Sequence, residues 1–365
     1  MTKRHPNGRA PLPFVSVIVP MRNEERFVGG CLRSLAAQDY PRDRFEVLVV
    51  DGGSTDGSPQ VAEDIARETG LPLRLLANPR RSTPCGLNLG IAQARGEVIT
   101  RVDAHAQVDP RFLSESVSAL LESGVDAVGG PIRSAGDGLL GGAIALAMSS
   151  PFGVGNAAFR YSREEQYTDT VAFPTYRRGV FERLGLFAED LEWGEDDEFH
   201  YRLGDAGGRL LLTPRVGSTY FTRSSLRALA RQYFRYGRVK VEVLRRHPRR
   251  TRLRQLAPGA FVLGLAATGV LATLRGLFVL PLATLAGAYG LASLIASLRA
   301  TGRGKRRYVA VLPAAFACLH LSYGLGFLVG VARMGAKLNL RTIEPLNPKS
   351  GAVVPRFPGS KVPES

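Results

Sequence analysis

The stretch that decides the fold is EVLVVDGGSTDGS at Glu46–Ser58, where a run of apolar residues ends in an acid and glycines. Val47–Val50 has the pattern of a strand buried on both faces of a parallel sheet. Asp51 follows directly, so we expect it at the carboxyl edge of the sheet, where open α/β sheets bind ligands. The glycines after it would let a ligand approach the backbone closely. An ordinary turn into a helix capped by Asp56 or Ser58 remains the alternative interpretation.

Strand and helix patterns alternate on both sides of this stretch. Short apolar runs are followed by amphipathic or glycine-terminated helix patterns. This alternation predicts an α/β fold with a mostly parallel, Rossmann-like sheet and helices on both faces. The predicted strands cover residues 14–20, 46–51, 73–76 and 97–102, and predicted helices cover residues 59–69 and 83–94.

Composition narrows the class of protein. The 365 residues carry a formal net charge of +16, and much of the basic excess lies late in the chain beside apolar segments. That placement favours anionic lipid over nucleic acid as the partner of the basic residues. Three cysteines without a CxxC pair argue against a disulfide framework or a zinc site. Residues 1–13 lack the apolar region of a secretory signal and are expected to be a disordered lead-in.

A second acid follows a predicted strand at Asp103-Ala104-His105. A carboxylate and an imidazole at positions i and i+2 of a strand end can turn toward one ion. Oxygen ligands suit Mg²⁺ or Mn²⁺, and Mn²⁺ tolerates imidazole better. Alternatively, His105 is a polar turn residue without a ligand.

The chain becomes strongly apolar over residues 256–332. Three segments, about 257–274, 277–298 and 308–331, are long enough to cross a bilayer. The basic runs at 245–254 and 299–307 should lie in the cytoplasm, which suits a two-helix hairpin between them. A third span would place three later cations on the opposite side, against the same rule. The number of spans and the side of the C-terminus therefore stay open, and one of the first two segments could be re-entrant or interfacial.

The segments flanking the apolar region differ from it in composition. Residues 223–255 are basic, and residues 224–244 within them have the pattern of an amphipathic helix suited to a membrane interface. Residues 333–365 are rich in proline, glycine and serine toward their end and are expected to form a disordered tail.

Four motifs in order carry a resemblance to a known family. The motifs are PMRNEE, VVDGGSTDGS, GLNLGIAQARGEVITRVDAH and GEDDEFHYRL. Together they resemble the family 2 glycosyltransferases, which have the GT-A fold, and the resemblance covers about residues 15–237. Among subfamilies the chain is most similar to the succinoglycan-type exopolysaccharide glycosyltransferases, which carry membrane helices after the catalytic domain. The resemblance implies a GT-A domain at residues 14–222.

The resemblance also implies roles for individual residues. The residues matching the family's nucleotide-sugar site are Pro20, Arg22, Asn23, Glu24, Asp51, Gly52, Ser54 and Asp103. Asp103 matches the first acid of the metal-binding DxD motif. His105 stands where the family usually has the second acid of this motif. This difference from the family pattern bears on which metal the site would bind.

The acidic run LEWGEDDEFHYR at Leu191–Arg202 resembles the family's ED motif. The resemblance implies that Asp196 is the general base, with Glu195 as its neighbour, because inverting transfer needs a carboxylate to take the acceptor's proton. Asp197 and Glu198 are expected to face solvent or cap the helix. The alternative is that the whole run is simply an acidic helix start, which the helix dipole stabilises.

Two further segments are implied to surround the acceptor. Gln232, Arg235 and Tyr236 resemble the QxxRW motif of membrane-bound members, in which glutamine and arginine contact the diphosphate and the aromatic residue borders the acceptor. Tyrosine replaces the usual tryptophan here. Residues 136–162 correspond to the acceptor side of the family, or else form a loop over the rim of the sheet.

The resulting hypothesis is a multi-pass membrane-anchored inverting glycosyltransferase whose catalytic domain faces the cytoplasm. It would move a sugar from a nucleotide-diphosphate sugar to a lipid-linked or polysaccharide hydroxyl, assisted by Mn²⁺ or Mg²⁺. One alternative is a processive polysaccharide synthase, although so few spans make a polymer channel hard to build. The other is a catalytically inactive membrane-tethered scaffold that only binds a nucleotide sugar.

Overall fold

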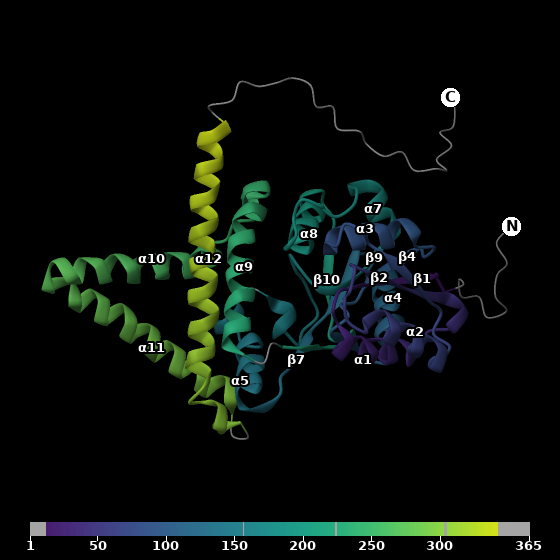
Figure 1. Ribbon diagram of the computed structural model, residues 1–365, viewed down its shortest axis with the longest axis horizontal. Coiled ribbons are helices and arrows are strands. Elements are labelled where there is room, and N and C mark those ends of the chain that lie inside the picture. Colours follow the sequence, from purple (N-terminus) through teal and green to yellow (C-terminus); the bar gives the residue numbers. More distant parts are fainter. Residues whose placement is uncertain (1–11, 156, 223–224, 303–304, 342–365) are drawn as a thin grey trace.

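The computed structural model describes residues 12–155, 157–222, 225–302 and 305–341. Figure 1 shows an α/β body on one side and a pair of long helices, α10 and α11, that extends away from it. Two further long helices, α9 and α12, lie between the body and that pair.

The body is built on an eight-stranded sheet with the strand order β3-β2-β1-β4-β9-β6-β10-β8. The first four of these strands are mutually parallel, whereas β9 runs antiparallel to both of its neighbours. The strands are β1 (Val15–Met21), β2 (Phe45–Asp51), β3 (Leu73–Ala77), β4 (Val98–Arg101), β6 (Ala127–Gly130), β8 (Gln166–Tyr167), β9 (Ala172–Arg177) and β10 (Leu210–Leu212).

A second, three-stranded sheet has the order β5-β11-β7. Its strands are β5 (Ala106–Val108), β7 (Ile132–Ala135) and β11 (Ser218–Phe221). It begins only a few residues after β4, so the chain passes from the large sheet to the small one through Asp103 and His105. This passage places both side chains where the two sheets meet.

Helices cover the large sheet and continue into the apolar region. Those of the body are α1 (Glu25–Ala36), α2 (Ser58–Thr69), α3 (Thr83–Gln93), α4 (Phe112–Ser123), α5 (Gly138–Met148), α6 (Pro151–Val154), α7 (Arg178–Leu184) and α8 (Glu195–Asp205). The later helices are α9 (Leu226–Arg246), α10 (Leu253–Leu274), α11 (Val279–Thr301) and α12 (Leu312–Arg341).

The central strands β1 and β2 are the apolar runs that the sequence predicts to be buried on both faces of the sheet. The side chains of β1 and β2 are almost all buried, because helices cover both faces of the sheet. Their parallel register pairs Met21 with Asp51. The loops that follow the two strands are therefore held side by side at the carboxyl edge of the sheet.

The predicted fold class is confirmed, with two local corrections. Residues 136–162 are not a rim loop: they contain α5, whose glycine- and alanine-rich surface packs closely against Tyr308. The last helix continues to Arg341, so the predicted tail begins later than residue 333. Most of the predicted lead-in and the rest of the tail, residues 1–11 and 342–365, lie outside the described residues.

Three helices are long and apolar enough to cross a membrane by length and composition: Leu253–Leu274, Gly276–Thr301 and Leu312–Gly335. The first two expose most of their apolar side chains, whereas α12 packs much of its surface against the body. The three helices therefore differ in their surroundings although their hydropathies are alike.

Candidate active site

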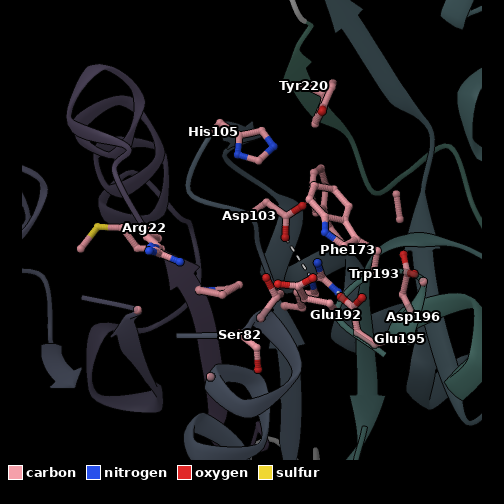
Figure 2. A pocket seen from close by; sticks show the side chains of 18 of the residues that line it. Arg22, Ser82, Asp103, His105, Phe173, Glu192, Trp193, Glu195, Asp196 and Tyr220 are labelled. Carbon is pink, nitrogen blue, oxygen red and sulfur yellow. Dashed lines mark hydrogen bonds and ion pairs between the residues drawn. The ribbon is translucent and has the colours of Figure 1, made fainter. Parts of the chain in front are cut away.

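A cavity of about 310 Å³ opens at the carboxyl edge of the central strands. Side chains from four of the sequence motifs line it, together with residues of β9, β11 and α9. Figure 2 shows Asp103 and His105 on one side and Trp193, Glu195 and Asp196 on another. The lining residues named as site candidates from the sequence are Pro20, Arg22, Glu24, Gly52, Asp103, His105, Glu195, Asp196, Gln232 and Tyr236.

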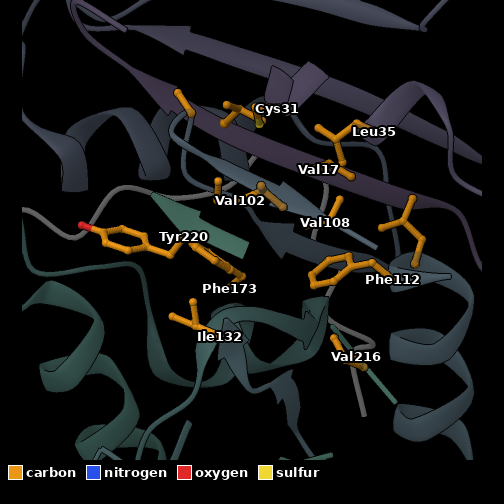
Figure 3. Packing of buried hydrophobic residues seen from close by; sticks show 14 of the residues in the cluster. Val17, Cys31, Leu35, Val102, Val108, Phe112, Ile132, Phe173, Val216 and Tyr220 are labelled. Carbon is orange, nitrogen blue, oxygen red and sulfur yellow. The ribbon is translucent and has the colours of Figure 1, made fainter. Parts of the chain in front are cut away.

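The wall opposite the central strands is apolar at its base. Phe173, Ile132 and Tyr220 line the cavity and also belong to the hydrophobic core between the two sheets, as Figure 3 shows. Phe173 has a φ of +43°, which is a strained backbone conformation for a bulky residue. Such strain is often found at ligand sites, where the surrounding packing maintains it. The placement of Phe173 therefore depends on both sheets.

The loop after β1 and the loop after β2 are joined to each other by hydrogen bonds. Only some of their side chains therefore point into the cavity. Asn23 donates its backbone N–H to Ser54 Oγ at 2.9 Å, and its side chain accepts from the Thr55 N–H at 2.8 Å. Asp51 Oδ1 accepts from Ser54 Oγ at 2.6 Å. Among the described residues, Asn23, Asp51 and Ser54 do not line the cavity, and they fix the loop on which Gly52 does.

Arg101 connects the two acidic motifs. Its Nε donates to Asp103 Oδ1 and its Nη1 donates to Glu195 Oε1, each at 2.9 Å. The Arg101 side chain is only 14% exposed, so these ion pairs are poorly screened by water. Burial alone would raise the pKa of Asp103, but the charges of Arg101 and His105 outweigh it and hold that pKa below its ordinary value.

The two acids of the ED motif begin helix α8 and have raised pKa values. Burial, reinforced by the neighbouring charge of Asp196, raises the pKa of Glu195 to about 7, although Arg101 opposes the shift. Burial and the charge of Asp197 likewise raise the pKa of Asp196. Asp196 Oδ1 accepts only a backbone N–H bond among the described contacts, from Asp197 at 2.8 Å. Its second oxygen is therefore available to a ligand in the cavity.

The other two acids of this run, Asp197 and Glu198, were expected to face solvent or cap the helix, but both are paired with cations. Asp197 is paired with the ammonium of Lys240 on α9. Glu198 is buried and accepts from Arg202 at 2.8 Å. Neither faces solvent freely, because α9 and the segment before α8 cover this side of the helix.

His105 is paired with an acid of the first loop. Its Nδ1 lies 3.1 Å from Glu24 Oε1, and its ring packs edge-on against Tyr220. The described residues contain no cluster of three or more acidic, histidine or cysteine side chains placed to hold a metal. Asp103 and His105 nevertheless line one cavity, and a carboxylate with an imidazole suits Mn²⁺.

The QxxRW-like segment on α9 contributes two of its three residues to the cavity. Gln232 donates to Tyr236 Oη at 2.8 Å, while its own Oε1 is buried without a partner in the described structure. Arg235 does not line the cavity; its guanidinium stacks on Trp193 at 5.3 Å from the ring centroid. Trp193 lines the cavity instead, so Arg235 adjoins the cavity through this ring.

Arg101 and Arg160 also line the cavity but were not predicted from the sequence. Arg160 ends a short 3-10 helix, Ala158–Arg160, and its guanidinium lies 5.7 Å from the centroid of the Tyr220 ring. Its Nη1 is buried without a partner among the described residues. Arg160 stands in none of the four motifs, and Arg101 lies within the third motif without having been singled out, so the place of each in the fold identifies it.

A mostly parallel sheet with acidic residues at its carboxyl edge and a second small sheet beside them defines a GT-A-type α/β protein. A mannosyltransferase from Pyrobaculum calidifontis, PcManGT, solved with GDP-Man and Mn²⁺, has the same fold, with a TM-score of 0.59 and 23% identity. The likeness covers 85% of this chain and 87% of that one. It supports the fold class predicted from the sequence.

The chain belongs to glycosyl transferase family 2, whose sequence profile matches residues 16–185. It is 28% identical over 316 residues to the succinoglycan biosynthesis protein ExoA of Rhizobium meliloti, covering 85% of this chain and 93% of that protein. It is 29% identical over 240 residues to a dolichyl N-acetyl-alpha-D-glucosaminyl phosphate 3-beta-D-2,3-diacetamido-2,3-dideoxy-beta-D-glucuronosyltransferase of Methanococcus voltae, covering 64% and 74%. The protein is thus a glycosyltransferase, and the predicted enzyme class is confirmed.

Proposed function

We propose that this protein transfers a sugar, with inversion, from a nucleotide-diphosphate sugar to a lipid-linked or polysaccharide hydroxyl at a membrane surface. The observation that carries the proposal is that Asp103, Asp196 and Gln232, from three separate motifs, line one cavity. In the reaction, the acceptor oxygen forms a bond to the anomeric carbon as the bond from that carbon to the diphosphate oxygen breaks. The acceptor's proton passes to Asp196, and the nucleoside diphosphate leaves.

The donor would bind across the first two loops. Gly52 lets a ligand approach the loop that Asn23, Asp51 and Ser54 hold in place. We assign the nucleoside to this side, supported by the resemblance of these loops to the family's nucleotide site. Asp51 then acts mainly by orienting the loop through Ser54.

The diphosphate would lie nearer to the middle of the cavity. Arg160 offers a guanidinium nitrogen without a partner there. The unpartnered atom of Gln232 is an amide oxygen, which only accepts hydrogen bonds and so suits a hydroxyl of the donor sugar or the acceptor. Because Arg235 stacks on Trp193 outside the cavity, we assign the positive charge beside the diphosphate to Arg160. Arg235 is assigned to the positioning of Trp193.

Asp103 and His105 would hold a divalent ion together with the donor's diphosphate. When bound, such an ion would offset the negative charge that develops on the leaving diphosphate. The support is the donor chemistry of the two side chains and their shared place in the cavity. Arg101 keeps Asp103 ionised, and so ready for a cation, at neutral pH.

The acceptor would approach from a second cavity of about 760 Å³ between α9, α12 and the segment before α8. This cavity shares Glu192 and Trp193 with the first, so the two adjoin at these side chains. Its other lining residues include Arg238 and Arg333, whose charges suit a phosphate-linked acceptor. The name of the Methanococcus voltae relative, which includes a lipid-linked sugar phosphate, is consistent with this assignment.

A release assay tests the proposed function. Purified protein in detergent is supplied with a panel of nucleotide sugars, membrane lipid extract and Mn²⁺, Mg²⁺ or chelator, and nucleoside diphosphate is measured. We expect release from one preferred donor that needs both extract and metal. Binding of a donor without release under any condition would instead support the scaffold alternative.

In the same assay, Arg160→Ala should weaken donor affinity more than Arg235→Ala.

The raised pKa values predict how transfer depends on pH. Asp196 accepts a proton only when ionised, and burial raises its pKa above the ordinary value near 3.9. Transfer should therefore fall as pH decreases, at a pH above the ordinary pKa of an aspartate, because the base becomes protonated there. Glu195, with a pKa of about 7, should extend this loss toward neutral pH. The profile of kcat/KM against pH checks this, and a flat profile from pH 8 to pH 4 would contradict it.

A further inference from the structure

Helices α9 and α12 pack side by side over most of the length of α9. Near its start, Cys318 Sγ donates to Leu226 O at 3.3 Å. Further along, a Cβ added at Gly326 would lie 2.0 Å from Phe234 O, and one at Gly330 would lie 2.7 Å from Arg238 O. Contacts that advance together along both chains mean that the helices run in the same direction. Small residues at this interface let the two backbones approach closely.

This packing places the two helices at the same depth relative to any membrane. On α9, the arginines exposed to the surroundings are Arg227, Arg231, Arg235 and Arg245. A charged side chain costs several kcal/mol in the middle of a bilayer, about 2.5 to 3.5 even on the lowest scales. A helix with four exposed arginines, which also forms a wall of the active site, does not lie in hydrocarbon. Its close neighbour α12 therefore does not cross the bilayer either.

The hairpin of α10 and α11 has the opposite character. Its close approaches to α12 involve its base, where an added Cβ at Gly324 would meet Pro258 O at 2.3 Å, and the middle of α11, where Tyr289 Oη lies 2.9 Å from His320 Nδ1. Its far end is open, with Leu274 71% and Leu277 80% exposed. The 22 residues of α10 span about 33 Å, enough for a hydrocarbon core of about 30 Å. Figure 1 shows this hairpin leading away from the body, while α9 and α12 run across its base.

We propose that only the α10–α11 hairpin crosses the membrane and that α12 lies in the interface beside α9, with its outer face against lipid. The apolar residues exposed on α12 include Leu321, Leu325 and Val331, which supply that face. This inference goes beyond the proposed transfer reaction, because it assigns a lipid-binding surface and a chain topology.

Two spans also remove a conflict in the distribution of charge. The hairpin's base is flanked by cations on both sides, whereas its tip carries Arg275 alone. With α12 in the interface, the later cations Arg333, Lys337 and Arg341 lie on the same side as the catalytic domain. All these basic segments then obey the positive-inside rule with a cytoplasmic domain. A third span would place the last three on the opposite side.

Labelling of single cysteines from each side of sealed membrane vesicles tests the topology. The sites are Glu63→Cys on the catalytic domain, Gly276→Cys at the hairpin tip and Gly335→Cys on α12. An added Cβ at Gly276 or Gly335 meets nothing within 4 Å, so both changes should be tolerated. Cys31 and Cys85 are buried, and the unaltered chain serves as the blank for them and for Cys318.

We expect a membrane-impermeant maleimide to label Gly335→Cys and Glu63→Cys from the same side of the vesicle membrane. It should label Gly276→Cys from the opposite side. Labelling of Gly335→Cys together with Gly276→Cys would show a third span and overturn it. Labelling of Gly276→Cys from the side of Glu63→Cys would overturn the crossing of the hairpin.

A depth measurement gives an independent check. Nitroxide labels are attached to Leu325→Cys on α12 and to Leu263→Cys in the middle of α10, both at exposed positions. We expect the label on α12 at the level of the lipid head groups and the label on α10 near the bilayer centre. Equal, central depths for both labels would overturn the proposal.

Discussion

Asp196→Asn is expected to lower the rate of sugar transfer by about 10²- to 10⁴-fold while leaving donor binding nearly unchanged, because a general base typically contributes that much. The substitution keeps the shape of the side chain and its backbone hydrogen bond from Asp197. It removes only the oxygen charge that takes the acceptor's proton. Initial rates of nucleoside diphosphate release with acceptor, together with donor titrations, separate the two effects.

The matched controls for this substitution lie on the same helix. Asp205→Asn, at the other end of α8 and partly exposed, should leave transfer close to its original rate. Glu195→Gln should mainly disturb Arg101, to which Glu195 is bonded. If Asp196→Asn kept full transfer while Glu195→Gln lost it, the base would be Glu195 and the assignment of roles within the pair would be wrong.

Arg101→Met is expected to reduce both stability and activity. The change leaves the carboxylates of Asp103 and Glu195 buried without their cation. Removing one partner of a buried ion pair costs about 3 to 5 kcal/mol. The free energy of unfolding in detergent should fall by an amount of this order, and transfer should be lost because Asp103 is no longer held ionised beside the donor.

A second substitution distinguishes this electrostatic role from simple packing. Combining Arg101→Met with Glu195→Gln removes one of the two unpaired carboxylates, so part of the lost stability should return. If the double variant were as unstable as the sum of its parts, the ion pairs would not be the source of the effect.

The sequence predicts the central half of the large sheet well because its physical signals are strong there. β1 and β2 are continuous apolar runs, and Gly70 after α2 adopts the positive φ of +64° expected for a helix end. The antiparallel direction of β9 and the pairing of the three-stranded sheet are not predicted, because the partners of these strands lie far away in the sequence and local patterns carry little information about them.

The candidate site is predicted to a similar extent. Motif order identifies the loops that line the cavity, but it does not reveal the direction of a side chain. Asn23 and Ser54 bind each other, and Arg235 stacks on Trp193, although the family resemblance implied that all three contact the ligand. Arg160 stands in no motif, so its contribution emerges only when β11 brings Tyr220 beneath it.

The apolar helices show a further limit of sequence patterns. Hydropathy ranks α12 with α10 and α11 as a candidate span. Whether an apolar helix meets lipid on all sides or a protein on one side depends on tertiary packing. On α12 the close contact of Gly330 with α9 settles that question, and a hydropathy window does not contain this information.

The measurement that tests the central claim most directly is the anomeric configuration of the product. With the preferred donor identified from the release assay, the new glycosidic bond is assigned by proton NMR and compared with the configuration of the sugar in the donor. Direct attack by an acceptor hydroxyl that Asp196 deprotonates predicts the opposite configuration in product and donor. Retention of configuration would contradict the assigned role of Asp196 and the single-displacement reaction that rests on it.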